Sequence, residues 1–138
     1  MNRSLLMIKP DAYKRGLEPS ILERITGAGL RIVHSERRKL RCEEVEELYG
    51  EHRGKPFFKI NRDFILSGPV GIFVVGGNGN VVKRLRELVG NKRPELAERG
   101  TIRGDYGINR ERIEENLVHA SEDSASAKRE VEIFLGSG

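Results

Sequence analysis

Residues 70–75, VGIFVV, are apolar without interruption and mostly β-branched. A run of this length and composition is typical of a strand in the middle of a sheet. Gly68 and Pro69 end the segment before it, and GGNGN at residues 76–80 supplies a turn after it. The stretch therefore predicts a central strand near the midpoint of the chain, and the neighbouring segments are interpreted relative to it.

On both sides of this strand, apolar patterns alternate between the period of a strand and that of a helix. The other expected strands lie at residues 4–10, 30–40 and 116–120. The expected helices lie at residues 17–28, 43–54, within 54–69, at 81–89 and at 124–135. This order matches a split β-α-β plan of class α+β, with a four-stranded antiparallel sheet covered by helices on one face. Residues 90–115 are expected to be irregular, because RGTIRGDYG within them is too rich in glycine and charge for a core element.

Composition limits the class of protein. The 138 residues are 37% hydrophobic and 33% charged, which suits one soluble domain spanning residues 1–138. No apolar run approaches the roughly 20 residues that cross a bilayer, and the N-terminus lacks the apolar core of a signal peptide. The single cysteine, Cys42, cannot form an internal disulfide, so we expect a cytoplasmic protein. The net charge of +4 favours an anionic partner.

The segment NLVHAS, residues 116–121, contains one histidine. Imidazole can act as a base, a nucleophile or a metal ligand near neutral pH, but a histidine in a strand is more often a hydrogen-bonded core residue. Glu130 bears on this choice, because it interrupts the apolar face of the last expected helix. It needs a partner, and His119 lies one strand and one turn upstream. The alternatives are that Glu130 reaches solvent or pairs with Lys128 or Arg129.

Phosphate-binding side chains are also indicated. The chain has no glycine-rich phosphate loop of the usual spacing, so side chains must bind any phosphate. The candidates are Lys9 at a strand end, Arg86 beside an apolar helix stripe, and Arg103 between two glycines. The alternative is that each is an ordinary surface charge. The three histidines are scattered, and no spacing typical of a protein-held metal site occurs.

The chain resembles the nucleoside diphosphate kinase family along nearly its whole length. The resemblance rests on NLVHASED together with IKPDAYKRG, YGEHRGKPFF, SGPVG, VVKRLRELVG and GTIRGD, which occur in the family's order. It implies a ferredoxin-like fold and a homo-oligomer, either a hexamer or a tetramer. It also implies Mg²⁺-dependent transfer of the terminal phosphate between nucleoside triphosphates and diphosphates through a phosphohistidine. The Mg²⁺ is expected to be carried by the nucleotide phosphates rather than by the protein, and neither membrane nor nucleic acid is required.

The resemblance also assigns roles to individual residues. His119 is implied to be the nucleophile, with Glu130 and Ser121 orienting it. Phe57 falls where the base stacks. The remaining implied contacts are to phosphates or ribose hydroxyls, at Lys9, Tyr49, His52, Arg86, Lys92, Arg103 and Asn116.

The sequence departs from the family pattern at four places, one of which is Gly76, where an acidic residue is common after the third strand. Glu122 follows Ser121 where the family has aspartate, and we interpret it as a substitution because an insertion would change the His119-to-Glu130 spacing. Lys92 stands where the family usually has a threonine, and residues 105–116 are longer than usual. These departures leave open an alternative, a nucleotide- or nucleic-acid-binding relative with weak or no kinase activity.

Overall fold

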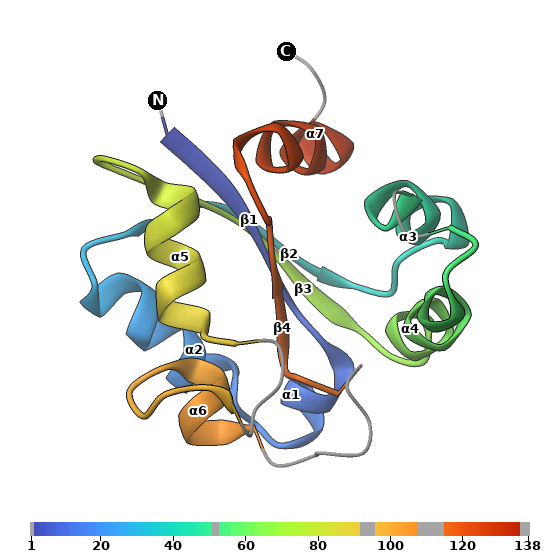
Figure 1. The fold of residues 1–138 in the computed structure, drawn as a ribbon, viewed down its shortest axis with the longest axis horizontal. Coiled ribbons are helices and arrows are strands. Elements are labelled where there is room, and N and C mark those ends of the chain that lie inside the picture. The colour runs from blue at the N-terminus through green and yellow to red at the C-terminus, as the bar shows by residue number, and fades with distance from the viewer. Residues whose placement is uncertain (1, 51–52, 92–95, 108–114, 136–138) are drawn as a thin grey trace.

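The computed structural model of the chain describes residues 2–50, 53–91, 96–107 and 115–135. Within these residues, one antiparallel sheet has the strand order β2-β3-β1-β4 (Figure 1). The strands are β1 (Asn2–Ile8), β2 (Arg31–Arg38), β3 (Val70–Gly77) and β4 (Val118–Ala120). The predicted four-stranded antiparallel sheet is therefore confirmed, with VGIFVV in one of its two inner strands.

Helices cover both faces of the sheet, so the prediction that they cover one face was wrong. Successive side chains of a strand point to opposite faces, and those of β1 and β3 enter two separate apolar clusters. Leu6, Ile8, Phe73 and Val75 belong to the first cluster, whereas Leu5, Met7, Ile72 and Val74 belong to the second. An inner strand that is buried on both faces needs an apolar residue at every position, which is the pattern of VGIFVV.

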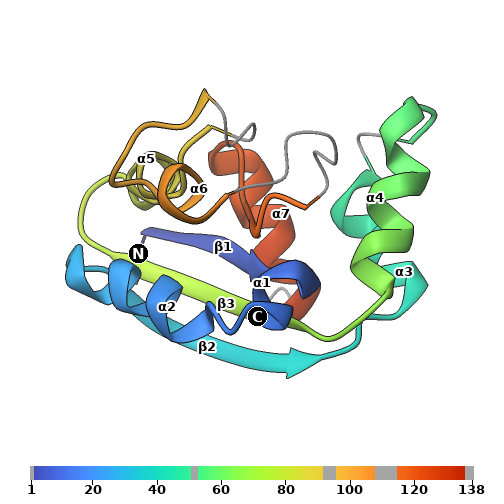
Figure 2. The ribbon, with the colours of Figure 1, turned by 90° about the horizontal axis from the view of Figure 1, so that it is seen from below.

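The helices divide between these two clusters (Figure 1). The first face is packed by α2 (Glu18–Gly27), α5 (Val81–Val89) and α6 (Ile102–Tyr106). The second is packed by α3 (Cys42–Leu48), α4 (Pro56–Leu66) and α7 (Ser124–Leu135). A short helix, α1 (Pro10–Lys14), follows β1 directly. Figure 2 shows β2 at one edge of the sheet, with β3 next to it and β1 on the far side of β3.

Two short helices were not predicted. Helix α6 lies within the stretch that was expected to be irregular and outside the core, yet Ile102 is fully buried in the first cluster. The glycine of this helix is required by packing, because a Cβ at Gly104 would overlap the carbonyl oxygen of Glu98. Like α6, α1 has five residues, too few to show an amphipathic period.

The register of the sheet brings distant segments together. Met7 of β1 lies opposite His119 of β4, and the end of β1 leads into Lys9, which precedes α1. Because α7 packs against β1 and α3, its buried side chains lie near the same strand. No described helix is both long and apolar enough to span a membrane.

Candidate active site

The predicted contact between Glu130 and His119 is present. His119 Nε2 lies 2.8 Å from Glu130 Oε1, and the Glu130 side chain on α7 is almost completely buried. Since an ionised carboxylate only accepts hydrogen bonds, this geometry assigns the ring proton to Nε2. The other ring nitrogen, Nδ1, then keeps its lone pair, which a nucleophile requires.

Ser121 supports the same carboxylate. Its hydroxyl donates to Glu130 Oε1 at 2.9 Å and accepts the amide of Leu5 at 3.3 Å. Its own amide donates to the Leu5 carbonyl at 3.2 Å, and the side chain is fully buried. The inner strand β1 therefore fixes Ser121, and Ser121 restrains Glu130.

Arg129 also reaches Glu130, as one of the sequence alternatives proposed. Its Nη2 lies 3.6 Å from Glu130 Oε2, while Nη1 donates to the carbonyl of Glu47 at 2.8 Å. The arginine thus links α7 to α3. The two interpretations of Glu130 are compatible, because each carboxylate oxygen has its own partner.

A strained turn leads into β4. Leu117 has φ 75°, and the amide of Val118 donates to the carbonyl of Asn116 at 2.9 Å. A hydrogen bond between residues two apart around a positive φ defines a γ-turn, a conformation that leucine adopts rarely. Asn116 is the first residue of this turn and His119 follows its last residue, so the turn lies between these two side chains.

Three of the predicted phosphate-binding residues meet beside this turn. Lys9 Nζ donates to Asn116 Oδ1 at 2.8 Å, and Arg103 Nε donates to the Asn116 carbonyl at 3.1 Å. Lys9, Arg103 and Asn116 are all at least nine-tenths buried. For Lys9 and Arg103, the alternative of an ordinary surface charge is therefore wrong.

Arg103 holds the surrounding backbone as well. Its Nη2 donates to the Val118 carbonyl at 2.6 Å and its Nη1 to the Gly90 carbonyl at 3.1 Å. Burial lowers the pKa of Arg103 to about 10, which still leaves the guanidinium protonated at neutral pH. A permanent cation therefore lies within the loop framework of the site.

Tyr49 at the end of α3 contacts the candidate nucleophile. Its ring packs edge-on against the His119 ring, with centroids 5.2 Å apart and an angle of 67° between the planes. Burial raises the pKa of Tyr49, so its phenol stays neutral at physiological pH.

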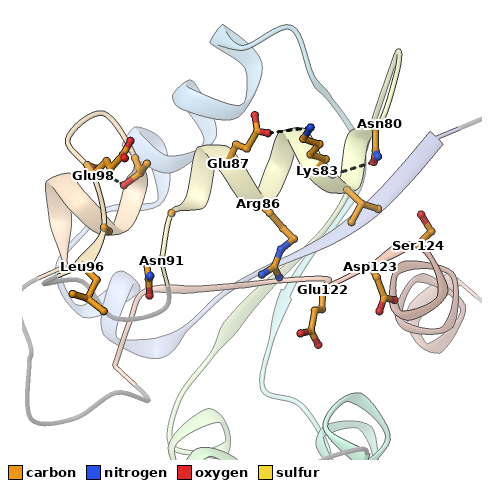
Figure 3. Close-up of a pocket in the computed structure, with 14 residues that line it drawn as sticks. Asn80, Lys83, Arg86, Glu87, Asn91, Leu96, Glu98, Glu122, Asp123 and Ser124 are labelled. Carbon is orange, nitrogen blue, oxygen red and sulfur yellow. Dashed lines mark hydrogen bonds and ion pairs between the residues drawn. The ribbon is translucent and has the colours of Figure 1, made fainter.

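These residues line a cavity of about 480 Å³. Its wall includes Lys9, Tyr49, Arg86, Arg103, Asn116 and His119. A larger hollow of about 940 Å³ lies along α5 and the start of α7 (Figure 3). Arg86 and Glu122 line both spaces, so the two lie next to each other at Arg86.

Arg86 differs from Arg103 in its surroundings. It is exposed on α5 and makes no side-chain hydrogen bond or ion pair with the residues that the structure describes. In Figure 3 it points from α5 toward the segment that carries Glu122. Phe57 lies apart from these residues on α4 with 63% of its side chain exposed, and it does not line the cavity. His52 and Lys92 lie outside the described residues.

Comparisons with known proteins identify the family of the chain. The sequence profile of the family described as nucleoside diphosphate kinase matches residues 2–138. A nucleoside diphosphate kinase of Streptomyces coelicolor is 47% identical over 134 residues, which cover 96% of this chain and 95% of that protein. This chain belongs to the nucleoside diphosphate kinase family. It is accordingly a phosphotransferase.

Solved structures of the family have the same fold. The apo nucleoside diphosphate kinase of Encephalitozoon cuniculi matches with a TM-score of 0.93 and 34% identity, over 99% of this chain and 90% of that one. The enzyme of Halobacterium salinarum in complex with CDP matches with a TM-score of 0.90 and 37% identity, over 96% and 86% of the two chains. These relatives do not favour the alternative of a binding protein without kinase activity.

The departure from the nucleoside diphosphate kinase pattern after Ser121 has a structural counterpart. Glu122 is exposed and lines both hollows. Asp123 lines only the larger hollow, and it accepts the amide of Ser126 at 2.7 Å, so it caps the N-terminus of α7. Asp123 therefore has a structural role at the start of α7, whereas Glu122 lies at the site. This difference supports the interpretation of Glu122 as a substitution for the family's aspartate.

Sequence reasoning missed several residues of this candidate site. Asp11 and Leu117 were given no role, although both lie inside quoted motifs, and Arg129 was considered only as a competing partner of Glu130. A buried aspartate after Lys9-Pro10 has no periodic signal, and a positive φ at leucine cannot be read from its residue type. Among the described residues, no group of three or more His, Cys, Asp or Glu side chains could hold a metal ion.

Proposed function

We propose that residues 1–138 act as one nucleoside diphosphate kinase domain in which His119 carries the phosphate between two nucleotides. The observation that supports this most directly is the contact of His119 Nε2 with Glu130. It leaves Nδ1 as the ring atom with a lone pair, beside a cavity lined by cationic and amide groups. Phosphoryl transfer depends mainly on alignment and charge stabilisation, and this set of residues provides both.

In the first half-reaction, the His119 Nδ1 lone pair attacks the γ-phosphorus of a nucleoside triphosphate. The Nδ1–P bond forms as the bond between the γ-phosphorus and the bridging oxygen breaks, and the nucleoside diphosphate leaves with that electron pair. The Nε2 proton stays in its hydrogen bond to Glu130, whose negative charge stabilises the charge that develops on the ring. In the second half-reaction, a terminal oxygen of another nucleoside diphosphate attacks the same phosphorus and releases His119.

The cations around the cavity neutralise the phosphate charge in both steps. Lys9 and Arg103 are held in place by Asn116, so they need little rearrangement. Arg86 is more exposed and is proposed to bind phosphate oxygens as the nucleotide enters. Phe57 is proposed to stack on the base, which would favour broad tolerance of nucleotides because stacking does not read base edges.

The divalent metal ion is proposed to be Mg²⁺ that arrives with the nucleotide, as part of the substrate. This fits a site whose charged side chains beside His119 are mainly cations, which suit phosphate oxygens rather than a metal ion. The homo-oligomer, whether hexamer or tetramer, and the cytoplasmic location stay predictions from the sequence, as do the roles of His52 and Lys92.

The test is a phosphorylation experiment with γ-labelled ATP. We expect an acid-labile, alkali-stable label on the wild-type chain, which GDP removes as labelled GTP. The variant His119→Ala should take no label while it still binds ADP. If the wild-type chain binds nucleotide but takes no label, the chain is a binding relative and the proposed function is wrong.

A further inference from the structure

Asp11 is a buried carboxylate to which the mechanism above gives no role. It lies at the start of α1, two residues after Lys9, and only 7% of it is exposed. Its Oδ2 accepts the amide of Leu117 at 3.0 Å, from a segment 106 residues away in the sequence. Its Oδ1 is also buried and has no hydrogen-bond partner among the described residues. Burying a carboxylate is unfavourable, so the hydrogen bond that Asp11 accepts from Leu117 calls for an explanation.

The contact holds the strained γ-turn before β4. The Leu117 amide is bound by Asp11, and the Leu117 carbonyl accepts the amide of Lys9 at 2.9 Å. The peptide groups on both sides of the Leu117 Cα are thus fixed by the junction of β1 and α1. A leucine at φ 75° persists only where its surroundings hold it.

The conformation of this turn also sets the position of the reacting groups. The Asn116 carbonyl closes the turn and also accepts Arg103 Nε, while the Asn116 side chain accepts Lys9 Nζ. On the other side of the turn, β4 has three residues and pairs only with β1 among the described strands. So short an edge strand has few bonds of its own to fix His119.

We propose that Asp11 is a positioning residue for phosphoryl transfer, which holds the turn at Leu117 and so sets His119 relative to Lys9 and Asn116. The inference rests on the proposed function, because it concerns the rate of transfer to His119. It assigns the effect to the hydrogen bond that Asp11 accepts, and not to its negative charge.

A role for the charge is the competing explanation, because the carboxylate lies near Lys9. Burial raises the pKa of Asp11, whereas the charge of Lys9 and the Leu117 amide oppose that rise. An asparagine separates the two roles. Its amide oxygen can accept the Leu117 amide as Oδ2 does, but it carries no charge.

The experiment compares wild type, Asp11→Ala and Asp11→Asn by single-turnover labelling of His119 with γ-labelled ATP and by equilibrium binding of ADP. We expect Asp11→Ala to slow labelling about 30-fold and to change the Kd for ADP less than about threefold, because a misplaced nucleophile affects transfer more than binding. Asp11→Asn should label within about threefold of wild type, because it keeps the acceptor.

Ile21→Ala is the matched control for general destabilisation. Ile21 is fully buried in α2 and belongs to the first apolar cluster, which also contains Leu117, so this variant loses packing in that cluster but keeps every hydrogen bond that holds the turn. All assays are run at a temperature where circular dichroism shows each variant folded, and Ile21→Ala should label at the wild-type rate. If Asp11→Ala does not fold, Asp11→Asn decides, because retained labelling supports the acceptor role and lost labelling contradicts it.

Three results would overturn the inference: wild-type labelling by Asp11→Ala, equally slow labelling by Asp11→Asn and Asp11→Ala, or equally slow labelling by Ile21→Ala. A wild-type chain that takes no label is a different outcome. It contradicts the proposed function itself, and the inference falls with it.

Discussion

Two buried glutamates on the same face of the sheet have opposite surroundings. Glu44 on α3 accepts two bonds from Arg38, at 2.8 and 2.7 Å, and further bonds from the backbone and side chain of Arg41. Glu130 on α7 is bound at 2.8–2.9 Å by His119 and Ser121, and its one arginine contact is longer, at 3.6 Å. The charge of Glu44 is therefore compensated within the fold, whereas that of Glu130 is available to the cation that we propose forms on His119 during transfer.

The difference separates a structural carboxylate from a functional one. The hydrogen bonds from Arg38 lower the pKa of Glu44 to about 2 from its ordinary 4.5, as expected of a group that stabilises the fold. Glu130 Oε1 instead binds the His119 ring and the Ser121 hydroxyl, and the arginine contact at its other oxygen, Oε2, is longer, at 3.6 Å. Removing each carboxylate should therefore affect a different property of the protein.

The largest expected effect is that of Glu130→Ala on transfer. Losing the group that orients His119 and stabilises its charge should slow labelling by at least about 100-fold. The Kd for ADP should change by less than about threefold, because Glu130 makes its contribution on the way to the transition state. Single-turnover labelling and ADP titration measure the two quantities, and equal losses in both would show that Glu130 is structural.

The second effect is that of Glu44→Gln on stability. We expect a loss of about 2 kcal/mol in the free energy of unfolding at pH 7, measured in urea, because Arg38 loses one of its two carboxylate partners and keeps only Glu36. The labelling rate should stay within about twofold of wild type. A variant that keeps its stability but loses activity would reverse the comparison.

The pH dependence of this loss follows from the lowered pKa of Glu44. Between about pH 4.5 and pH 2 the unfolded chain binds this proton more readily than the folded one. The stability that Glu44 contributes is therefore complete above pH 4.5 and is lost as the pH falls toward 2. The difference in the free energy of unfolding between wild type and Glu44→Gln should shrink over the same pH range. A difference that persists at low pH would contradict this source of stability.

The smallest effect is that of Ser121→Ala, which sharpens the comparison. The variant removes the hydrogen bond from the Ser121 hydroxyl to Glu130 and the one that this hydroxyl accepts from the Leu5 amide. It leaves the contact of Glu130 with His119, so labelling should slow by about 10-fold. Leu5→Ile serves as the matched control, since it changes packing beside the Ser121 amide without removing a polar partner. Labelling at the wild-type rate by Ser121→Ala would show that Glu130 needs no support from β1.

Whether a feature of the fold or the site could be predicted from the sequence depended on how far apart in the chain the interacting residues lie. The central strand, the large helices and the off-pattern Glu130 follow from local periodicity, and the contact between Glu130 and His119 was inferred from chain proximity. The covering of both faces was misjudged, although the unbroken apolar pattern of residues 70–75 already indicated it. Helix α6 and the three backbone contacts of Arg103 could not be inferred, because they join segments with no pattern of their own.

By itself, the sequence determined the order of elements, the family and the identity of the candidate nucleophile, because periodicity and motif spacing are properties of the chain. Tertiary structure alone decided that Asp11 meets Leu117 and that Lys9, Arg103 and Asn116 share one turn. The physical reason is that a buried polar group needs a partner at hydrogen-bond distance. Which distant residue meets that need is decided only when the strands pair and the helices pack.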